Sequence, residues 1–337
     1  MLWKELLQKK KTNEAYSKDY HVLRFFSSFV AISGGKVVEV ADACMVFCPL
    51  VKMFYKQMRH LDGSNQEAIR EKIKDVIEDK IRRFGFFSER RELLKDDIAV
   101  PYGASEILMY AMQKKHVDAA VIVCDGAGSV IVTAPEVVQG IGARMNGLFY
   151  TTTIPAIVEK LKKSYGHVVF SDAHIDQIQA AEEACKLGFK RIAVTINGYM
   201  EKEHLCEIKK IEKKYGVTIT TLVVCTTGAS QERVLEIKEY ADLVWSCASK
   251  EVREIIGPHA LVQVSEKIPV FVLTPKGLSL LSAYSDSRTT IENLNSQKQY
   301  IISNRCEGEK IRMGKWITKL GSTRLPIRSS QEPSLRK

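Results

Sequence analysis

Cysteines are the side chains in this 337-residue sequence with the widest chemical range, and the chain has eight of them. Three of these, Cys124, Cys225 and Cys247, each end a short apolar run and precede a turn. Helices are expected to follow Cys225 and Cys247, and a helix N-terminus favours the thiolate, which is both a nucleophile and a soft metal ligand. Lys250, three residues after Cys247, acts in the same direction. We therefore predict that these cysteines are metal ligands.

Two further cysteines, Cys44 and Cys48, are four residues apart, and Pro49 follows the second. Two thiolates at this spacing can reach one metal ion, and a Cys-Pro pair is common at iron–sulfur sites. A complete cluster needs about four thiolates, so the pair would have to borrow ligands from the strand-end cysteines or from a partner. The alternative is structural burial, because a free cysteine is most often a small buried apolar residue.

Glycines are dense directly after Cys124, where Asp125 is followed by Gly126 and Gly128. Glycines after a strand allow backbone N–H groups to close on an anion, and Arg144 would supply a fork-shaped donor. The spacing matches neither the dinucleotide fingerprint nor the phosphate loop, so a plain glycine turn is the alternative. The predicted ligand-binding residues are Cys124, Asp125, Gly126, Gly128, Gln139, Gly140, Gly142, Arg144, Thr226, Thr227, Ser249 and Lys250. The predicted metal ligands are Cys44, Cys48, Cys124, Cys225 and Cys247.

Familiar catalytic motifs are missing from the sequence. It contains no Ser/His/Asp elbow, no HExxH pattern and no pair of catalytic carboxylates. The residues alone therefore leave open whether the protein is an enzyme.

Short apolar runs alternate with helical stretches from about residue 96 to residue 284. This alternation predicts right-handed crossovers and an α/β fold with a doubly wound, mostly parallel sheet. In such a sheet every strand ends at the same edge, where α/β folds bind their ligands. Cys124, Cys225 and Cys247 should then converge at that edge.

The sequence divides into three expected regions. Residues 1–92 form a smaller N-terminal α+β module, in which Gly34-Gly35 joins a hairpin and a long helix runs from a capping box at Ser64 and Glu67 to Gly85. Residues 93–285 form the Rossmann-like body. Residues 286–337 form a basic, partly disordered tail, which after about Gly321 should make few contacts with the body.

Charge and composition limit the partners. The net charge of +10 is compatible with an anionic small molecule. Nucleic acid is not predicted, because no zinc finger, helix-turn-helix or aromatic-basic signature accompanies the charge. No segment reaches the ~18 apolar residues of a membrane helix, and the start lacks an apolar leader, so we expect a cytoplasmic protein without a membrane partner.

One long segment, residues 121–144, reads VIVCDGAGSVIVTAPEVVQGIGAR. This segment closely resembles the methanogenesis marker protein 8 family, whose members occur in methane-forming archaea. Shorter stretches fit the same pattern, among them Cys48-Pro49-Leu50, residues 103–106 and residues 241–250. The resemblance spans roughly residues 30 to 282. The extended N-terminal arm and the basic tail are atypical of the family.

The resemblance implies a biological context, that of methane-forming archaea, but no particular reaction, since the family is named for its distribution. That distribution suggests a role with methyl-coenzyme M reductase or its maturation proteins, and an iron–sulfur cluster or a nickel tetrapyrrole as cofactor. The favoured hypothesis is a protein that binds a metal or metallocofactor through strand-end cysteines and assists its maturation or use. One alternative is an enzyme that binds a phosphorylated or nucleotide ligand at the glycine loop. Another is a non-catalytic interaction protein.

Overall fold

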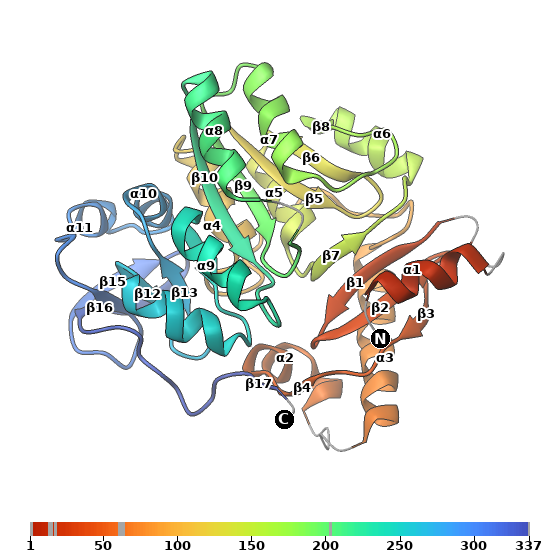
Figure 1. The fold of residues 1–337 in the computed structure, drawn as a ribbon, viewed down its shortest axis with the longest axis horizontal. Helices are drawn as coiled ribbons and strands as arrows, with labels where there is room; N and C mark the ends of the chain where they lie inside the picture. The colour runs from red at the N-terminus through yellow and green to blue at the C-terminus, as the bar shows by residue number, and fades with distance from the viewer. Residues whose placement is uncertain (1–2, 13–15, 17–18, 60–64, 202–203, 336–337) are drawn as a thin grey trace.

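The computed structural model describes residues 3–12, 16, 19–59, 65–201 and 204–335. It contains an 11-stranded sheet, a 4-stranded sheet and a 2-stranded ribbon, shown in Figure 1. The large sheet has the strand order β15-β16-β14-β12-β13-β11-β10-β9-β5-β6-β8. Among the helices of the described residues, none is long and apolar enough to cross a membrane.

Four neighbouring strands form a parallel centre in the large sheet. They are β5 (Ala119–Cys124), β9 (Arg191–Asn197), β10 (Thr218–Val224) and β11 (Leu243–Trp245). Helices α8 (Cys206–Tyr215) and α9 (Gln231–Tyr240) connect the last three of them. The carboxyl ends of these strands therefore lie at one edge of the sheet, as expected for crossover connections.

Outside this centre the sheet is largely antiparallel. The outer strands are β6 (Gly128–Val132), β8 (Gly166–Val168), β12 (Val262–Val264), β13 (Val270–Val272), β14 (Tyr300–Ile302), β15 (Glu309–Met313) and β16 (Trp316–Ser322). The pairs β5/β6, β6/β8, β11/β13, β12/β13, β14/β16 and β15/β16 are antiparallel, and β12/β14 is parallel. The prediction of a doubly wound, mostly parallel sheet is therefore wrong. A strand buried on both faces reads as an apolar run whatever its direction, so the alternation of runs and helices did not reveal the hairpins.

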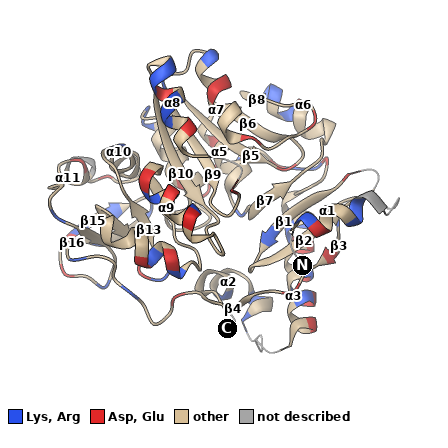
Figure 2. Cartoon of the chain, viewed as in Figure 1, with Lys and Arg blue, Asp and Glu red and all other residues tan. Residues whose placement is uncertain are grey.

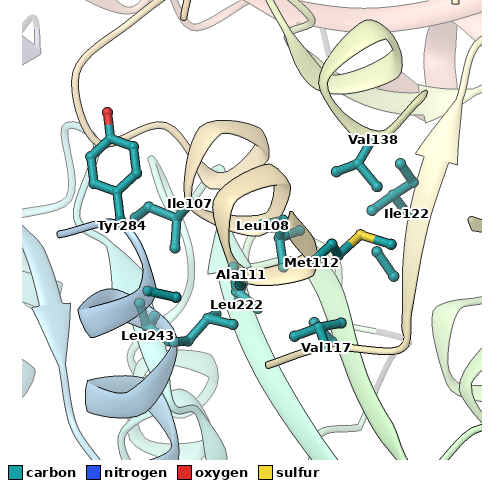
Figure 3. Close-up of a cluster of buried hydrophobic side chains, with 14 of the residues drawn as sticks. Ile107, Leu108, Ala111, Met112, Val117, Ile122, Val138, Leu222, Leu243 and Tyr284 are labelled. Atoms are coloured by element: carbon teal, nitrogen blue, oxygen red, sulfur yellow. The ribbon is translucent and has the colours of Figure 1, made fainter. Parts of the chain in front are cut away.

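Helices cover both faces of the sheet, and the strand side chains alternate between the two layers. Ala120, Ile122 and Cys124 face one core, whereas Ala119 and Val121 face the other. The first layer holds α4 (Ala104–Gln113), α5 (Pro135–Gly142), α6 (Pro155–Lys163) and α10 (Pro275–Ala283), and the second holds α7 (Gln177–Lys186), α8 and α9. Figure 3 shows part of the first core, where Ile107, Leu108, Ala111 and Met112 of α4 meet the sheet.

The N-terminal sheet has the order β3-β2-β1-β7. Its strands are β1 (His21–Phe25), β2 (Ser28–Ser33), β3 (Lys36–Val40) and β7 (Gly147–Tyr150). Because β7 comes from within the expected body, the two regions share this sheet. The turn at Gly34-Gly35 has left-handed φ angles of 58° and 67°, so the predicted hairpin turn is confirmed. The division at residue 92 stays a prediction.

Helices of the N-terminal region include α1 (Trp3–Thr12), α2 (Pro49–Phe54) and the long α3 (Gln66–Phe84). The end of α3 at Gly85 is confirmed, since this glycine has a φ of 68° and its amide caps Ile81. Ser64 lies outside the described residues. The side chain that caps α3 is that of Asn65, which accepts a hydrogen bond from the Ala68 amide.

The expected tail joins the body instead of standing apart from it. After α11 (Arg288–Glu292), strands β14, β15 and β16 extend the large sheet. The prediction of a partly disordered tail is wrong for residues 300–335, which form strands of the sheet. The sequence looked polar because basic side chains alternate with buried ones on these outer strands. In β15, for example, Ile311 and Met313 are buried while Lys310 and Arg312 are exposed. Lysine and arginine are common on edge strands, where they oppose further pairing.

The last described segment, residues 323–335, crosses back to the N-terminal region. Leu325 is buried, and the Gln263 side chain bonds both backbone groups of Ile327 at 2.9 Å. The final strand, β17 (Ser334–Leu335), then pairs with β4 (Met45–Phe47). Elsewhere the charge is mixed: Figure 2 shows residues of both signs on α8 and α9.

Candidate functional site

A cavity of about 430 Å³ lies between the N-terminal region and the carboxyl edge of the parallel strands. The carboxyl ends of the four central strands, β5, β9, β10 and β11, contribute to its wall. The β1–β2 turn, α2 and the start of α4 contribute as well. Pro333 from the C-terminal segment also lines it. Most of the lining is apolar; its polar and sulfur-bearing members include Arg24, Ser27, Cys48, Ser105, Glu106, Arg144, Asn146, Thr195, Asn197, Cys225, Thr227 and Cys247.

Three thiols share this cavity: those of Cys48, Cys225 and Cys247. Burial raises the pKa of Cys48, and burial together with the charge of Cys247 raises the pKa of Cys225 to about 12. Cys247 also acts on Cys48, so it lies within electrostatic range of both other thiols. The expected lowering by a helix dipole is wrong for Cys225, because α9 begins only at Gln231 and burial outweighs any such effect.

Both strand-end cysteines of the cavity have left-handed backbones. The φ angle is 60° at Cys225 and 45° at Cys247. Phe26, Ser27 and Arg144, which also line the cavity, have φ angles of 50°, 59° and 62°. Residues other than glycine rarely adopt such angles, and they concentrate at functional sites. Backbone strain therefore gathers around this cavity.

Each of these two cysteines is held by an arginine. Arg24 donates to the Cys225 and Thr227 carbonyls, both at 2.8 Å. Arg253 donates to the carbonyl of Cys247 at 2.6 Å and to that of Ser249 at 2.8 Å. In both loops one guanidinium thus bridges the cysteine carbonyl and the carbonyl two residues later, which fixes the thiol's position.

Hydroxyl groups lock the two loops to each other. The Thr226 hydroxyl donates to the Trp245 carbonyl at 2.8 Å, and the Thr227 hydroxyl accepts from the Ala248 amide at 3.1 Å. Gly147 completes the arrangement, since a Cβ there would lie only 2.6 Å from the Cys225 sulfur. The Gly147 amide also bonds this thiol and opposes the rise in its pKa.

Several polar side chains at the cavity were not among the predicted site residues, and Arg24, Glu106 and Asn197 are the most notable of them. The Glu106 carboxylate accepts hydrogen bonds from the Ala99 and Val100 amides at 3.1 Å and from the Ser105 hydroxyl at 3.0 Å. Asn197 ends β9, and its Nδ2 is buried without a hydrogen-bond partner within the described part of the chain. Its place at the end of an apolar run was the signal that could have identified it.

The glycine loop after Cys124 is the turn of the β5–β6 hairpin. Asp125 is fully buried, where it pairs with Arg91 at 2.9 Å and accepts from the Phe87 amide at 2.7 Å. The Gly126 amide donates to the Thr151 hydroxyl at 2.8 Å, and a Cβ on Gly128 would overlap the Ala173 carbonyl. The polar groups of this loop are thus used within the chain, and Cys124, Asp125, Gly126 and Gly128 do not line the cavity.

The cysteine of this loop is buried in the core and does not line the cavity. Cys124 belongs to the core beneath α4 and α5, and its thiol donates to the Asp125 carbonyl at 3.3 Å. Burial and the adjacent Asp125 raise its pKa well above the ordinary value. Cys124, Cys225 and Cys247 all follow or end strands whose carboxyl ends lie at the same edge of the sheet, as expected. Only Cys225 and Cys247 line the cavity, so the expected three-thiol site lacks Cys124.

The Cys44/Cys48 pair is also separated. Cys44 is exposed, whereas Cys48 is buried against the cavity. The residues between them form strand β4, and four residues of strand span about 13 Å. The predicted shared metal ion is therefore out of reach of both thiols at once.

The remaining predicted residues divide between the cavity and its supports. Gly142, Arg144 and Thr227 line the cavity, and Arg144 pairs with Asp97 at 2.7 Å. The other predicted ligand-binding residues, which do not line it, are Gln139, Gly140, Thr226, Ser249 and Lys250. Lys250 is exposed and lies 3.7 Å from Glu254.

No three His, Cys, Asp or Glu side chains of the described residues are grouped so that they could hold one metal ion. With Cys44 and Cys124 elsewhere, the cavity has three thiols rather than the four of a typical iron–sulfur cluster.

Fold and cavity together define a mixed α/β protein with a thiol-lined cavity at the carboxyl edge of its central parallel strands. Residues 21–284 match the family described as "Uncharacterized protein conserved in archaea (DUF2099)", and the chain belongs to this family. It is 35% identical over 265 residues to an uncharacterized protein of Methanocaldococcus jannaschii, which covers 78% of this chain and 89% of that one. No solved structure matches the chain. Neither description carries the name methanogenesis marker protein 8, so that assignment stays a prediction.

Proposed function

We propose that the protein binds an organic metallocofactor, or a precursor of one, in the thiol-lined cavity and assists its maturation or use. The observation that carries this proposal is the meeting of Cys48, Cys225 and Cys247 around one largely apolar cavity. Cavities of this size and character suit organic ligands, and thiolates suit soft metals.

The donor set decides what kind of metal group fits. Because no three His, Cys, Asp or Glu side chains of the described residues are grouped around one point, at most two of the thiols would coordinate a metal at once. They would complete the coordination of a metal that brings its other ligands. A nickel tetrapyrrole supplies its own ring nitrogens and leaves positions for a thiolate. An iron–sulfur cluster would need a fourth thiol from a partner. The raised pKa of Cys225 is no obstacle, because a thiol that coordinates a metal releases its proton to solvent.

The two cysteine loops that would hold such a group are fixed by contacts within the chain. Arg24 and Arg253 fix the two loops, and Gly147 leaves room for the Cys225 sulfur. The resemblance to the methanogenesis marker protein 8 family supports methyl-coenzyme M reductase or its maturation proteins as the partner, in the cytoplasm. The glycine loop is not part of the proposal, since its polar groups bond within the chain.

A second candidate is a metal-free organic ligand held by the same cavity. The high pKa of Cys225 favours this alternative, because a neutral thiol contacts an apolar ligand without the cost of burying a charge.

Anaerobic purification followed by metal analysis and an absorption spectrum tests the proposal. We expect the wild-type protein to retain metal, and the Cys225→Ser/Cys247→Ser double variant to retain about a tenth of it or less. The matched control is Cys206→Ser, whose half-buried thiol lies outside the cavity lining. A metal-free protein that retains an organic ligand would favour the second candidate. Equal metal contents in the wild-type protein and the double variant would contradict the cysteine assignment.

A further inference from the structure

Arg24 is an unusual cation within the cavity wall. Among the described residues, its guanidinium donates two hydrogen bonds, both to carbonyls of the Cys225 loop, which leaves three of its five N–H groups without a partner there. It lies over the Tyr199 ring at 4.6 Å and near the Phe149 ring at 5.4 Å. Within the described part of the chain, no carboxylate forms an ion pair with it.

Two other arginines at the cavity and its cysteine loops differ from Arg24, because each of them has a carboxylate partner. Arg144, which also lines the cavity, pairs with Asp97 at 2.7 Å. Arg253, which holds the Cys247 loop, lies 3.5 Å from Glu332. A half-buried cation without a counter-charge is costly, and aromatic faces offset only part of that cost. An anionic group of the ligand would complete the compensation at Arg24.

A second donor, that of Asn197, belongs to a residue lining the same cavity as Arg24. Asn197 pairs in register with Val224, the residue before Cys225, and Arg24 bonds the Cys225 carbonyl. The Asn197 Nδ2 is buried and has no partner within the described part of the chain, while its Oδ1 accepts from the Tyr199 amide at 3.0 Å. Such unsatisfied buried donors call for an explanation, and a ligand acceptor supplies one.

We propose that the ligand of this cavity carries a carboxylate, which is recognised by Arg24 and Asn197. A planar carboxylate matches the fork of a guanidinium, and its single charge matches the single unpaired cation. A phosphate would bring a second charge that no other free cation of the described lining compensates. Glu106, whose carboxylate also lines the cavity, disfavours a further anionic group beside it.

This inference rests on the proposed binding cavity but not on the metal. The test uses two probes of the same shape, naphthalene-2-carboxylate and naphthalene-2-carboxamide, titrated calorimetrically into the full chain at neutral pH. We expect the carboxylate to bind at least about tenfold more tightly, since charge-assisted hydrogen bonds are roughly twice as strong as neutral ones. Arg24→Met should remove this preference, and Arg24→Lys should reduce it, because lysine keeps the charge and loses the fork.

Arg144→Met is the matched control, since this cavity arginine already has a carboxylate partner and its loss should leave the preference unchanged. Asn197→Ala should lower affinity for the carboxylate a few-fold. The wild-type ratio tests the inference even if an Arg24 variant fails to fold. Equal affinities in the wild type, binding of neither probe up to millimolar concentration, or a preference that survives Arg24→Met would overturn it.

The two proposals can fail separately. A carboxylate preference in a protein that never retains metal would leave the acid-binding site intact and remove the metallocofactor. Retained metal without a carboxylate preference would support the metallocofactor and remove the acid-binding site.

Discussion

Two strand ends of the same sheet carry a cysteine followed by a glycine-containing turn. They differ in their hydrogen bonds, in the backbone angle at the cysteine and in whether the thiol faces a cavity. In the loop after Cys124, the carboxylate, the amides and the thiol all bond within the chain. In the loop after Cys225, the thiol faces a cavity, the backbone is left-handed at the cysteine, and the neighbouring Asn197 has a buried donor to spare.

The difference shows that chemical richness in a sequence motif is a weak sign of function. Asp125 and Arg91 are reactive residue types, but their pairing joins the N-terminal region to the hairpin turn. Strain and unsatisfied polar groups are better signs, because folding alone gives no reason to keep them. At the Cys225 side the two occur together, in the left-handed cysteine and in the Asn197 Nδ2 that has no partner within the described residues.

The largest expected effect comes from Asp125→Ala. This change leaves the Arg91 guanidinium buried without its counter-charge and the Phe87 amide without its acceptor. Removing one partner of a buried ion pair costs about 3–5 kcal/mol, so the free energy of unfolding should fall by that amount in urea titrations. Asp97→Ala, which breaks the partly exposed pair with Arg144, should cost about 1 kcal/mol or less. Similar small losses in both variants would show that the Cys124 loop is not a structural joint.

Removal of residues 323–337 is expected to have the next largest effect. The truncated chain loses the buried Leu325 and leaves Arg253 beside the Cys247 loop without Glu332. Burial of a leucine side chain contributes about 2 kcal/mol, so a clear fall in the melting temperature should follow. This reverses the sequence-based expectation for residues after Gly321. Removal of residues 336 and 337 alone is the control, and an unchanged melting temperature in both would restore that expectation.

The parts of the fold that could be predicted are those set by local chemistry. Gly85 ends α3 and Gly34-Gly35 turns a hairpin because both places need left-handed backbone. Strands β10 and β11 were recognisable as apolar runs, and their parallel pairing brings Cys225 and Cys247 to one edge.

The missed features depend on partners distant in the sequence. Arg24 reaches the Cys225 loop from a strand about two hundred residues earlier, and no spacing pattern encodes that contact. Apolar runs alone do not show whether two strands are joined by a hairpin or by a crossover connection. Asn197 was visible at a strand end, but its unsatisfied donor is a property of the folded chain.

Gly128→Ala is expected to have a smaller effect than the truncation or the charge change, and it compares the two loops directly. Gly128 has a φ of 70° and a Cβ there would overlap the Ala173 backbone, whereas Gly228, with a φ of 76°, has only the Tyr199 ring at 3.4 Å. Alanine at a left-handed position costs about 1 kcal/mol. Gly228→Ala should therefore lose about that much, and Gly128→Ala clearly more, when both are measured by urea denaturation. Equal losses would mean that the hairpin turn can relax away from Ala173.

The smallest effect, a change of reaction rate without a change of fold, separates the thiols of the two loops. Burial and Cys247 raise the pKa of Cys225 to about 12, so below pH 9 its thiol stays protonated. Because the thiolate is the nucleophile, iodoacetamide should alkylate Cys225 at least about tenfold more slowly than the exposed Cys44 at pH 8. Raising the pH to 11 should speed the reaction at Cys225, which faces the cavity, but not at Cys124, which is fully buried in the core. Mass spectrometry of digested protein gives each rate.

The raised pKa also means that Cys225 contributes stability below pH 9, which is lost as the pH rises toward 12. Cys225→Ser should remove that part of the alkaline loss. Alkylation of Cys124 as fast as that of Cys225 at pH 11 would show that the two loops are equally open, and the contrast between them would fail.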